Sequence, residues 1–448
     1  MKDFTKGKIL PEILLFSFPI FIGDFLQQMY VIVDTIVVGK LLGTQALAAI
    51  GVTQPIYGLI NSIFLGISIG FSILLAHQIG AKTSKDEYLK SIGTLVNSTL
   101  LCATVIFILG FFLSKKVLFL SGTPQNLLEQ SDIYLKCLLL GIVANFAMYS
   151  IGAVLRAFGD TKTPLIMSVT GSILNILLDI ILVQVFNMGL LGAALGTVLS
   201  QFVTSIVTII FSLKVYHIKL TNIKYLKNSF LSLKKALLYG MPIAVQYIFI
   251  SIGTIILVKI VVPLGITVIG AFTVIGRIEG FISMAFLNLS SGLTTYTAQN
   301  HGAKFYARIK KGFTQTLLFQ IMLTICISIT CMIFSRQISF LFSKDADIIE
   351  ITQKYILITS PFLFLYSIMV LIHGLLNGLG KTRIPLICTI FSYLIIRLPV
   401  SYFAKSTFEI LGLIWAVIIG WGTGLLYTCI ATFITTKKDS VKTSSDDF

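Results

Sequence analysis

Twelve apolar stretches dominate the sequence, and each is long enough to cross a lipid bilayer as an α-helix. A spanning helix needs about 20 residues, because it rises about 1.5 Å per residue and the hydrocarbon core is roughly 30 Å thick. We therefore predict an all-α integral membrane protein with twelve transmembrane helices. The expected spans are residues 11–38, 46–77, 91–114, 129–154, 164–186, 190–214, 235–258, 267–298, 313–335, 351–376, 384–404 and 411–435.

The distribution of charge orients these spans. Charged residues make up only 12% of the 448 residues, and the net charge is +16. Such an excess of positive charge can indicate nucleic-acid binding, but here twenty-three Lys and Arg residues fall on one set of loops and ends and seven on the other. Cytoplasmic loops of membrane proteins carry this excess. We expect both termini in the cytoplasm, a location in the plasma membrane, and no nucleic-acid partner.

The two halves of the sequence repeat one another. Residues 155–166 recur as 376–387, and residues 79–82 recur as 301–304, at offsets of 221 and 222. Because each half holds six spans, both halves enter the membrane from the same side. We expect a parallel repeat of two pseudo-symmetric six-helix bundles around a central cavity, which suits alternating access. The predicted parts are an N-terminal bundle (1–213), a cytoplasmic linker (214–235), a C-terminal bundle (236–436) and a cytoplasmic tail (437–448).

The first span contains two acids, Asp24 and Asp34, and a proline, Pro19. An ionised carboxylate in hydrocarbon costs at least about 2.5 kcal/mol, so such acids usually face a protein interior or a watery cavity. Proline removes one backbone hydrogen bond and allows the helix to bend. These features favour a mobile ion site. The alternative is that Asp34 simply lies near the outer surface, close to the end of the span.

Several motifs carry a resemblance to a known family. They are Tyr30-x-x-x-Asp34-Thr35-x-x-x-Gly39, Leu155-Arg156-x-x-Gly159-Asp160-Thr161-x-x-Pro164 and Asn175-x-x-x-Asp179. In this order the chain resembles the multidrug and toxic compound extrusion (MATE) transporters, in particular bacterial members coupled through the N-terminal bundle. The resemblance implies a monomer that exports amphipathic, often cationic compounds in exchange for H⁺ or Na⁺, without another cofactor. It places the coupling ion at Asp34, Asn175, Asp179 and Thr197.

Helix geometry supports that assignment independently. Asp34, Asp179 and Thr197 lie four to seven residues from the expected outer ends of their spans, so all three are roughly 6–11 Å below the outer surface. Asn175 is one turn from Asp179 on the same face. Their oxygens suit Na⁺, and two carboxylates that repel each other in a low dielectric can share a proton. A buried polar network that only holds helices together remains the alternative.

Other polar and adaptable residues within the spans are candidates for a substrate cavity. Asp24 lies near the middle of the membrane, with Gln28 one turn above it, and would serve as a counter-charge for cationic cargo. Aromatic and thioether side chains suit promiscuous pockets, although packing is their usual role. The candidates of this kind are Tyr30, Tyr57, Met148, Tyr149 and Met284.

The C-terminal half departs from the N-terminal pattern. It has Leu257 and Val400 where the first half has Asp34 and Asp179. Its intramembrane charges are a cluster of Arg277, Glu279 and Arg397, which we expect to be mutual partners because unpaired charges there are costly. Because it lacks the C-terminal acidic site that part of the family uses with Na⁺, we favour H⁺ as the coupling ion. His373 is a possible titrating group, but such a histidine more often bonds a neighbour.

Three other classes of function fit the sequence less well. A lipid-linked saccharide flippase of the same broad superfamily would usually have extra helices and a more cationic cavity. A membrane enzyme would need a metal cluster, a nucleophile elbow or a phosphate-binding glycine loop, and we find none of these motifs. A receptor or scaffold would have no use for duplicated bundles. We therefore expect neither catalytic residues nor a protein-bound metal.

Overall fold

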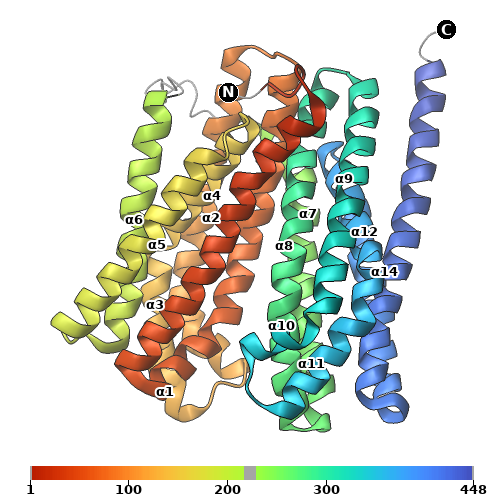
Figure 1. Ribbon diagram of the computed structural model, residues 1–448. Helices are drawn as coiled ribbons and strands as arrows, with labels where there is room; N and C mark the ends of the chain where they lie inside the picture. Colours follow the sequence, from red (N-terminus) through yellow and green to blue (C-terminus); the bar gives the residue numbers. More distant parts are fainter. Residues whose placement is uncertain (1–2, 216–228, 446–448) are drawn as a thin grey trace. The chain divides into compact units, whose positions relative to one another are not determined.

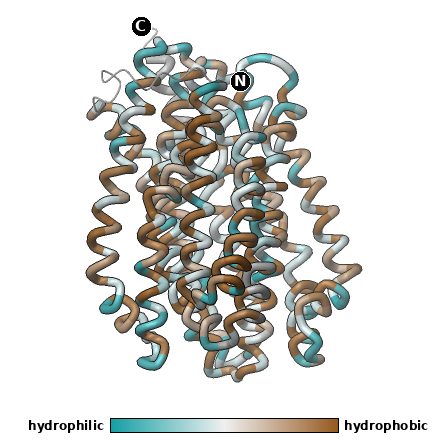
Figure 2. Tube along the Cα trace, turned by 90° about the vertical axis from the view of Figure 1, so that its left-hand side faces the viewer, coloured by the Kyte–Doolittle hydropathy of each residue, from teal (hydrophilic) through white to brown (hydrophobic). Residues whose placement is uncertain are grey.

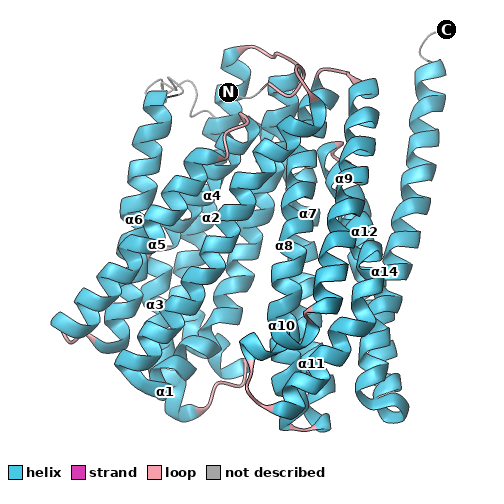
Figure 3. Ribbon diagram, viewed as in Figure 1, coloured by secondary structure: helices cyan, strands magenta, loops and turns pink. Residues whose placement is uncertain are grey.

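The computed structural model describes residues 3–215 and 229–445, except for the side chains of residues 33–37, 40, 44, 47, 215 and 436–445. All regular elements in these ranges are helices, and no strand occurs among them (Figure 3). Hydrophobic residues cover most of the length of the helices, while hydrophilic residues gather at their ends (Figure 2). This distribution fits a multi-pass membrane protein.

The helices follow the two predicted halves (Figure 1). The first half contains α1 (Ile9–Gly80), α2 (Lys85–Leu120), α3 (Gln125–Leu140), α4 (Ile142–Ala157), α5 (Lys162–Ile180), the π-helix η1 (Ile181–Val185) and α6 (Gly189–Val215). The second half contains α7 (Phe230–Val261), η3 (Val262–Leu264), α8 (Ile266–Gly302), α9 (Tyr306–Ile333), α10 (Ser335–Phe342), α11 (Ala346–Thr359), η4 (Ser360–Phe362), α12 (Leu363–Gly378), α13 (Arg383–Thr389), the π-helix η5 (Ile390–Arg397) and α14 (Leu398–Ser445).

Breaks within these helices separate the twelve spans. In the described ranges ten helices are long and apolar enough to cross a membrane, or eleven when α3 and α4, bent by 48° at Gly141, count as one span. One of these, Arg383–Thr435, contains a kink at Glu409 with φ 47°, where the sequence predicts the end of one span and the start of another. Gly43, with φ 78°, marks the same kind of break within α1. When α3 and α4 count as one span and the two sides of the Glu409 kink count as two, the described ranges contain twelve spans.

The repeated turns have the same backbone conformation in both halves. Gly159 and Gly380 have φ values of 79° and 76°, in the left-handed region where glycine is favoured. Lys82 and Lys304, the last residues of the other repeated motif, have φ values of 51° and 61°. The duplication seen in the sequence is therefore also present in the local structure.

The chain forms two compact units, and each receives the start of one helix from the opposite half. The first unit includes Phe18–Ala244, and the second includes Phe4–Ser17 together with the residues from Val245 onward. The first turns of α1 thus pack within the second unit, and the first half of α7 packs within the first. Each changeover lies next to a repeated proline, Pro19 in α1 and Pro242 in α7.

Glycines allow these exchanged segments to pack closely. In the first unit, a Cβ on Gly70 of α1 would lie only 2.7 Å from the backbone of Gly240 in α7. In the second unit, Gly292 of α8 lies against Ser17 of α1, and a Cβ there would be 3.3 Å from the carbonyl oxygen of Ile13. Small residues at such positions let membrane helices approach each other. Gly70 and Gly292 occupy equivalent positions of the repeat, 222 residues apart.

Candidate functional site

A buried polar cluster joins α5 and α6 in the first unit. Asn175 and Asp179 lie one turn apart on α5, with exposed fractions of only 2% and 1%. The Asn175 amide Nδ2 donates to Oδ1 of Asp179 and to Oγ1 of Thr197 on α6, each over 3.4 Å. The Thr197 hydroxyl in turn donates to the carbonyl oxygen of Ala193 over 3.2 Å. A carboxylate, an amide and a hydroxyl thus meet below the surface of the unit.

The local sequence makes room for this cluster. Asp179 lies two residues before the π-helix η1, an irregularity that is frequent at functional sites. On the facing helix, a Cβ at Gly196 would collide with the Asp179 carboxylate. The missing side chain at this position lets the carboxylate lie directly against the backbone of α6.

Helix α1 reaches the same cluster through Tyr30. The Tyr30 hydroxyl donates a hydrogen bond to Oδ1 of Asn175. The sequence suggested Tyr30 as a residue of the substrate cavity, whereas the structure places it against the candidate ion site. Asp34 is one helical turn after Tyr30 in α1, and its side chain lies outside the described residues. Three of the four predicted coupling residues are therefore brought together, with Tyr30 as an additional partner.

The chemistry of this cluster suits a small cation. An isolated carboxylate in an apolar interior is very costly, so Asp179 is best stabilised when a proton, a cation or hydrogen bonds compensate its charge. Carboxylate, amide and hydroxyl oxygens are hard ligands, which suit hard cations. Among the side chains that the structure describes, no group of three His, Cys, Asp or Glu residues is arranged to hold a metal ion. The oxygen donors of this cluster are suited to H⁺ or Na⁺.

A second polar cluster lies in the first unit around Tyr57. The amide Nδ2 of Asn145 on α4 lies 3.0 Å from the Tyr57 hydroxyl and 2.9 Å from Oδ1 of Asn61. The Gln201 side chain on α6 also bonds Tyr57. Tyr57 was a predicted cavity residue, but its two amide partners, Asn145 and Gln201, and the neighbouring Asn61 were missed. The signal that would have found them is an amide side chain within an apolar span.

The second unit contains a charged cluster around Glu279 of α8. The Tyr355 hydroxyl on α11 donates to Oε1 of Glu279, and Arg397 in η5 interacts electrostatically with both side chains. The guanidinium carbon of Arg397 also lies 4.9 Å from the ring centroid of Tyr393. Arg277 has an exposed side chain and is two residues from Glu279, which puts the two on different faces of α8. The structure thus brings Glu279 and Arg397 together, but not Arg277.

The clusters around Tyr57 and Glu279 occupy corresponding positions of the repeat. Tyr366 of the second unit bonds Ser283, interacts electrostatically with Glu279, and has its ring centroid 5.6 Å from that of Trp421. The matching pairs, 220 to 222 residues apart, are Tyr57 and Glu279, Asn61 and Ser283, Asn145 and Tyr366, and Gln201 and Trp421. The duplicated helices therefore build the same constellation twice, with neutral side chains in the first unit and an acid in the second.

The two predicted polar residues of the substrate cavity lie on an exposed stretch of α1. Asp24 and Gln28 both have exposed side chains, and Asp24 interacts electrostatically with Arg156 in the last turn of α4. A role for Asp24 as a counter-charge for cargo stays a prediction, but Arg156 already compensates part of its charge.

The remaining candidates are packed within the two units. The Met148 sulfur accepts a weak hydrogen bond from Thr208 over 3.8 Å, Tyr149 is half-buried, and Met284 in the second unit is 6% exposed. Their role in a substrate site stays a prediction. His373 is buried, with Nε2 3.2 Å from the Thr428 hydroxyl oxygen. This contact is a satisfied hydrogen bond in the interior of the unit.

Comparison with known proteins decides the family. The model for MatE proteins matches the chain twice, over residues 19–181 and 242–403. The chain belongs to the MATE family. It is therefore a membrane transporter rather than an enzyme, as the sequence predicted. The two matches in the MATE chain begin at Pro19 and Pro242, so they also reproduce the duplication seen in the sequence.

Named relatives match this MATE chain over nearly their full lengths. The probable multidrug resistance protein YoeA of Bacillus subtilis is 27% identical, over 92% of this chain and 90% of the relative. The multidrug export protein MepA of Staphylococcus aureus (strain MSSA476) is 25% identical, over 99% of both chains. The solved structure of a MOP superfamily transporter from Pyrococcus furiosus superimposes with a TM-score of 0.89 at 23% identity, over 97% of this chain and 98% of the other. That likeness confirms the predicted all-α fold.

Proposed function

We propose that this MATE protein is a secondary active antiporter. It exports amphipathic, cationic drugs and toxic compounds in exchange for a cation, by alternating access. The relatives that carry the words multidrug resistance and multidrug export in their names support the class of cargo. The protein acts as a monomer in the plasma membrane, with both termini in the cytoplasm, as the positive charge on one set of loops indicates.

The observation that carries the proposal is the contact of α1 with the buried oxygen cluster. Asp179 is 1% exposed, and its neighbour Asn175 bonds both Thr197 and Tyr30. A cation that reaches Asp179 neutralises a buried charge and changes what the Asn175 amide can bond. Tyr30 transmits this change to α1, which contains Pro19 as a point of bending. We include Asp34 in the site because it follows Tyr30 by one helical turn.

The coupling ion in this proposal is H⁺, with Na⁺ as the alternative. The acid of the charged cluster in the second unit, Glu279, interacts with the positive charge of Arg397 and so already has a compensating partner. We therefore assign the change of charge on ion binding to the α5–α6 cluster, in which the Asp179 carboxylate is buried. The oxygens of Asn175 and Thr197 would also hold Na⁺, so the ion has to be determined by experiment.

Reconstitution into proteoliposomes tests the proposal. Drug transport would be measured under an imposed pH gradient without Na⁺, and under an imposed Na⁺ gradient at equal pH. We expect transport in the first condition and its loss in Asp179→Asn, which removes the charge at almost constant volume. Asp347→Asn, the same change at an exposed acid of α11, is the matched control and should transport normally. Transport that requires Na⁺ would contradict proton coupling, and normal transport by a well-folded Asp179→Asn would contradict the assigned site.

A further inference from the structure

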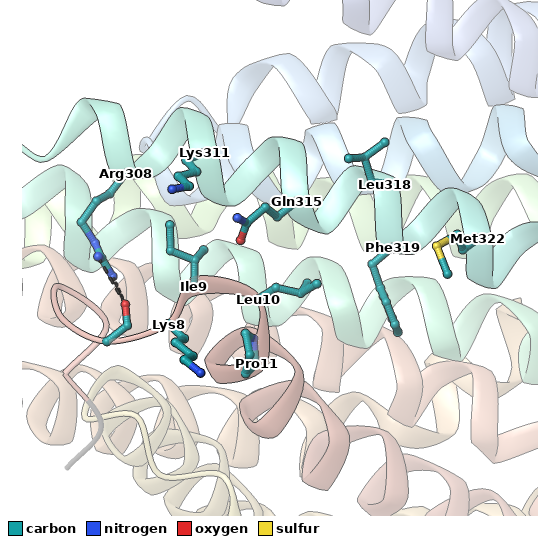
Figure 4. A pocket seen from close by; sticks show the side chains of 11 residues that line it. Lys8, Ile9, Leu10, Pro11, Arg308, Lys311, Gln315, Leu318, Phe319 and Met322 are labelled. Atoms are coloured by element: carbon teal, nitrogen blue, oxygen red, sulfur yellow. Dashed lines mark hydrogen bonds between the residues drawn. The ribbon is translucent and has the colours of Figure 1, made fainter.

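A groove in the second unit has an arrangement of side chains that the transport mechanism does not use. It has a volume of about 700 Å³ and runs between α9 and residues 7–11, which include the start of α1 (Figure 4). One end is lined by Lys8, Arg308 and Lys311, and the other by apolar side chains that include Leu318 and Met322. Among the described residues that line it there is no acid, although the Glu12 carboxylate lies against Gly7 and offsets one of the three positive charges. The groove is therefore positive at one end and apolar at the other.

Hydrogen bonds of Arg308 and a buried phenylalanine hold the backbone at the basic end of the groove in place. The Arg308 guanidinium donates through Nη2 to the carbonyl oxygens of Lys6 at 3.0 Å, Phe4 at 3.2 Å and Gly7 at 3.3 Å. The backbone N–H of Phe4 donates to Oε1 of Gln299 over 2.9 Å, and the Phe4 ring is fully buried. Arg308 thus holds the N-terminal segment, which carries Lys8, against α9, which carries Lys311 (Figure 4).

The lining of α9 changes in character along one face of the helix. Lys311 comes first, Gln315 follows one turn later, and Leu318, Phe319 and Met322 come after it. From Lys311 to Met322 the helix advances about 16 Å, which is close to half of the roughly 30 Å hydrocarbon core. Leu318 and Met322 are 60% and 63% exposed, so their side chains are open to whatever surrounds the unit. The order of a cationic group, an amide and hydrocarbon along α9 matches the order of phosphate, ester and acyl chain in a phospholipid.

We propose that this groove binds one anionic phospholipid. The phosphate lies between the ammonium groups of Lys8 and Lys311, the Gln315 amide donates to an ester carbonyl oxygen, and an acyl chain covers Leu318, Phe319 and Met322. Basic pockets beside membrane helices attract anionic head groups in this way. A zwitterionic lipid would bring its own ammonium group close to the two positively charged lysines. A cationic drug would meet only repulsion there. The inference does not depend on the coupling ion or on the cargo.

Lipid binding to the purified full-length protein tests this proposal. Native mass spectrometry in detergent would measure the affinity for dioleoylphosphatidylglycerol and for dioleoylphosphatidylcholine, and competition by inorganic phosphate. The key variant is Lys8→Gln with Lys311→Gln. Its matched control is Lys6→Gln with Lys310→Gln, which removes the same charge from neighbouring exposed positions that do not line the groove. One basic residue near a lipid surface contributes roughly 5-fold in affinity, so we expect about 30-fold weaker phosphatidylglycerol binding in the key variant and less than about 2-fold in the control.

Several outcomes would overturn the proposal. Equal loss in the two double variants would mean that only general surface charge attracts the lipid. Equal affinity of the wild type for both lipids would remove the role of the head-group charge. Displacement of phosphatidylglycerol by millimolar inorganic phosphate would reduce the site to an anion site without a contribution from the acyl chain. If the key double variant does not fold, Lys311→Gln alone decides, with an expected loss of roughly 5-fold against none in Lys310→Gln.

Discussion

Replacing Gly70 by alanine tests the close packing of α1 and α7 within the first unit. The added Cβ would lie 2.2 Å from the carbonyl oxygen of Ala236 and 2.7 Å from both Cα and N of Gly240. Carbon atoms in good contact are about 3.5–4.0 Å apart, so the two helices would have to separate by about 1 Å. The obstacle is backbone, which cannot rotate away as a side chain can. Overpacking of this kind costs about 1–3 kcal/mol, and we expect Gly70→Ala to destabilise the protein by that amount.

The matched control is Gly58→Ala in the same helix, because a Cβ there would meet nothing within 4 Å. Alanine is favoured over glycine in a helix by up to about 1 kcal/mol, so the control should be neutral or slightly stabilised. The assay is the thermal midpoint of the purified protein in detergent, followed by tryptophan fluorescence and by size exclusion. Gly292→Ala should cost less than Gly70→Ala, because the nearest neighbour of Gly292 is the Ser17 side chain. A Gly70→Ala midpoint equal to or above that of Gly58→Ala would refute the close-packing argument.

Two further substitutions test the polar clusters. Tyr30→Phe removes the hydroxyl that donates to Asn175, so we expect weaker coupled transport at unchanged protein yield. The control, Tyr306→Phe at an exposed position, should transport like the wild type. Equal transport by both variants would contradict a role of the Tyr30 hydroxyl. Glu279→Gln leaves the charge of Arg397 uncompensated and should lower the free energy of unfolding by about 1–3 kcal/mol. The control, Arg277→Gln at an exposed position, should leave the free energy of unfolding unchanged. In a double-mutant cycle, Glu279 and Arg397 should show a coupling energy above about 0.5 kcal/mol, and additive effects would count against their interaction.

Helix periodicity explains which parts of the site could be predicted from the sequence. Asn175 and Asp179 are four residues apart, so any helix places them on one face, and the depth of Thr197 follows from the boundaries of its span. Glu279 and Arg397 were grouped because unpaired charges are costly in a membrane. The same periodicity argues against Arg277 as a third member, since residues two apart on a helix point to different faces. The spacing of two residues between Arg277 and Glu279 was visible in the sequence and already spoke against grouping them.

Other features depend on tertiary packing that hydropathy does not encode. Nothing in an apolar span indicates that Phe4–Ser17 packs with the second unit, because its side chains would be buried equally well in either bundle. Tyr30 was assigned to a cavity by residue type, since its bond to Asn175 depends on how α1 rotates against α5. The break at Gly141, which divides the fourth span, was also not predicted, because a single glycine within an apolar stretch is common in membrane helices.

The asymmetry between the duplicated units bears directly on coupling. The neutral constellation around Tyr57 corresponds to the charged one around Glu279, where the charge of Glu279 is accompanied by that of Arg397 on η5. A duplicated scaffold can tolerate such a change in one copy because the added charges largely cancel within that copy. Asp179 in the first unit accepts a hydrogen bond from the neutral amide of Asn175. Under the proposed antiport, a cation that binds at Glu279 would leave the charge of Arg397 without its partner. We therefore expect coupling in the first unit, even though both units share one architecture.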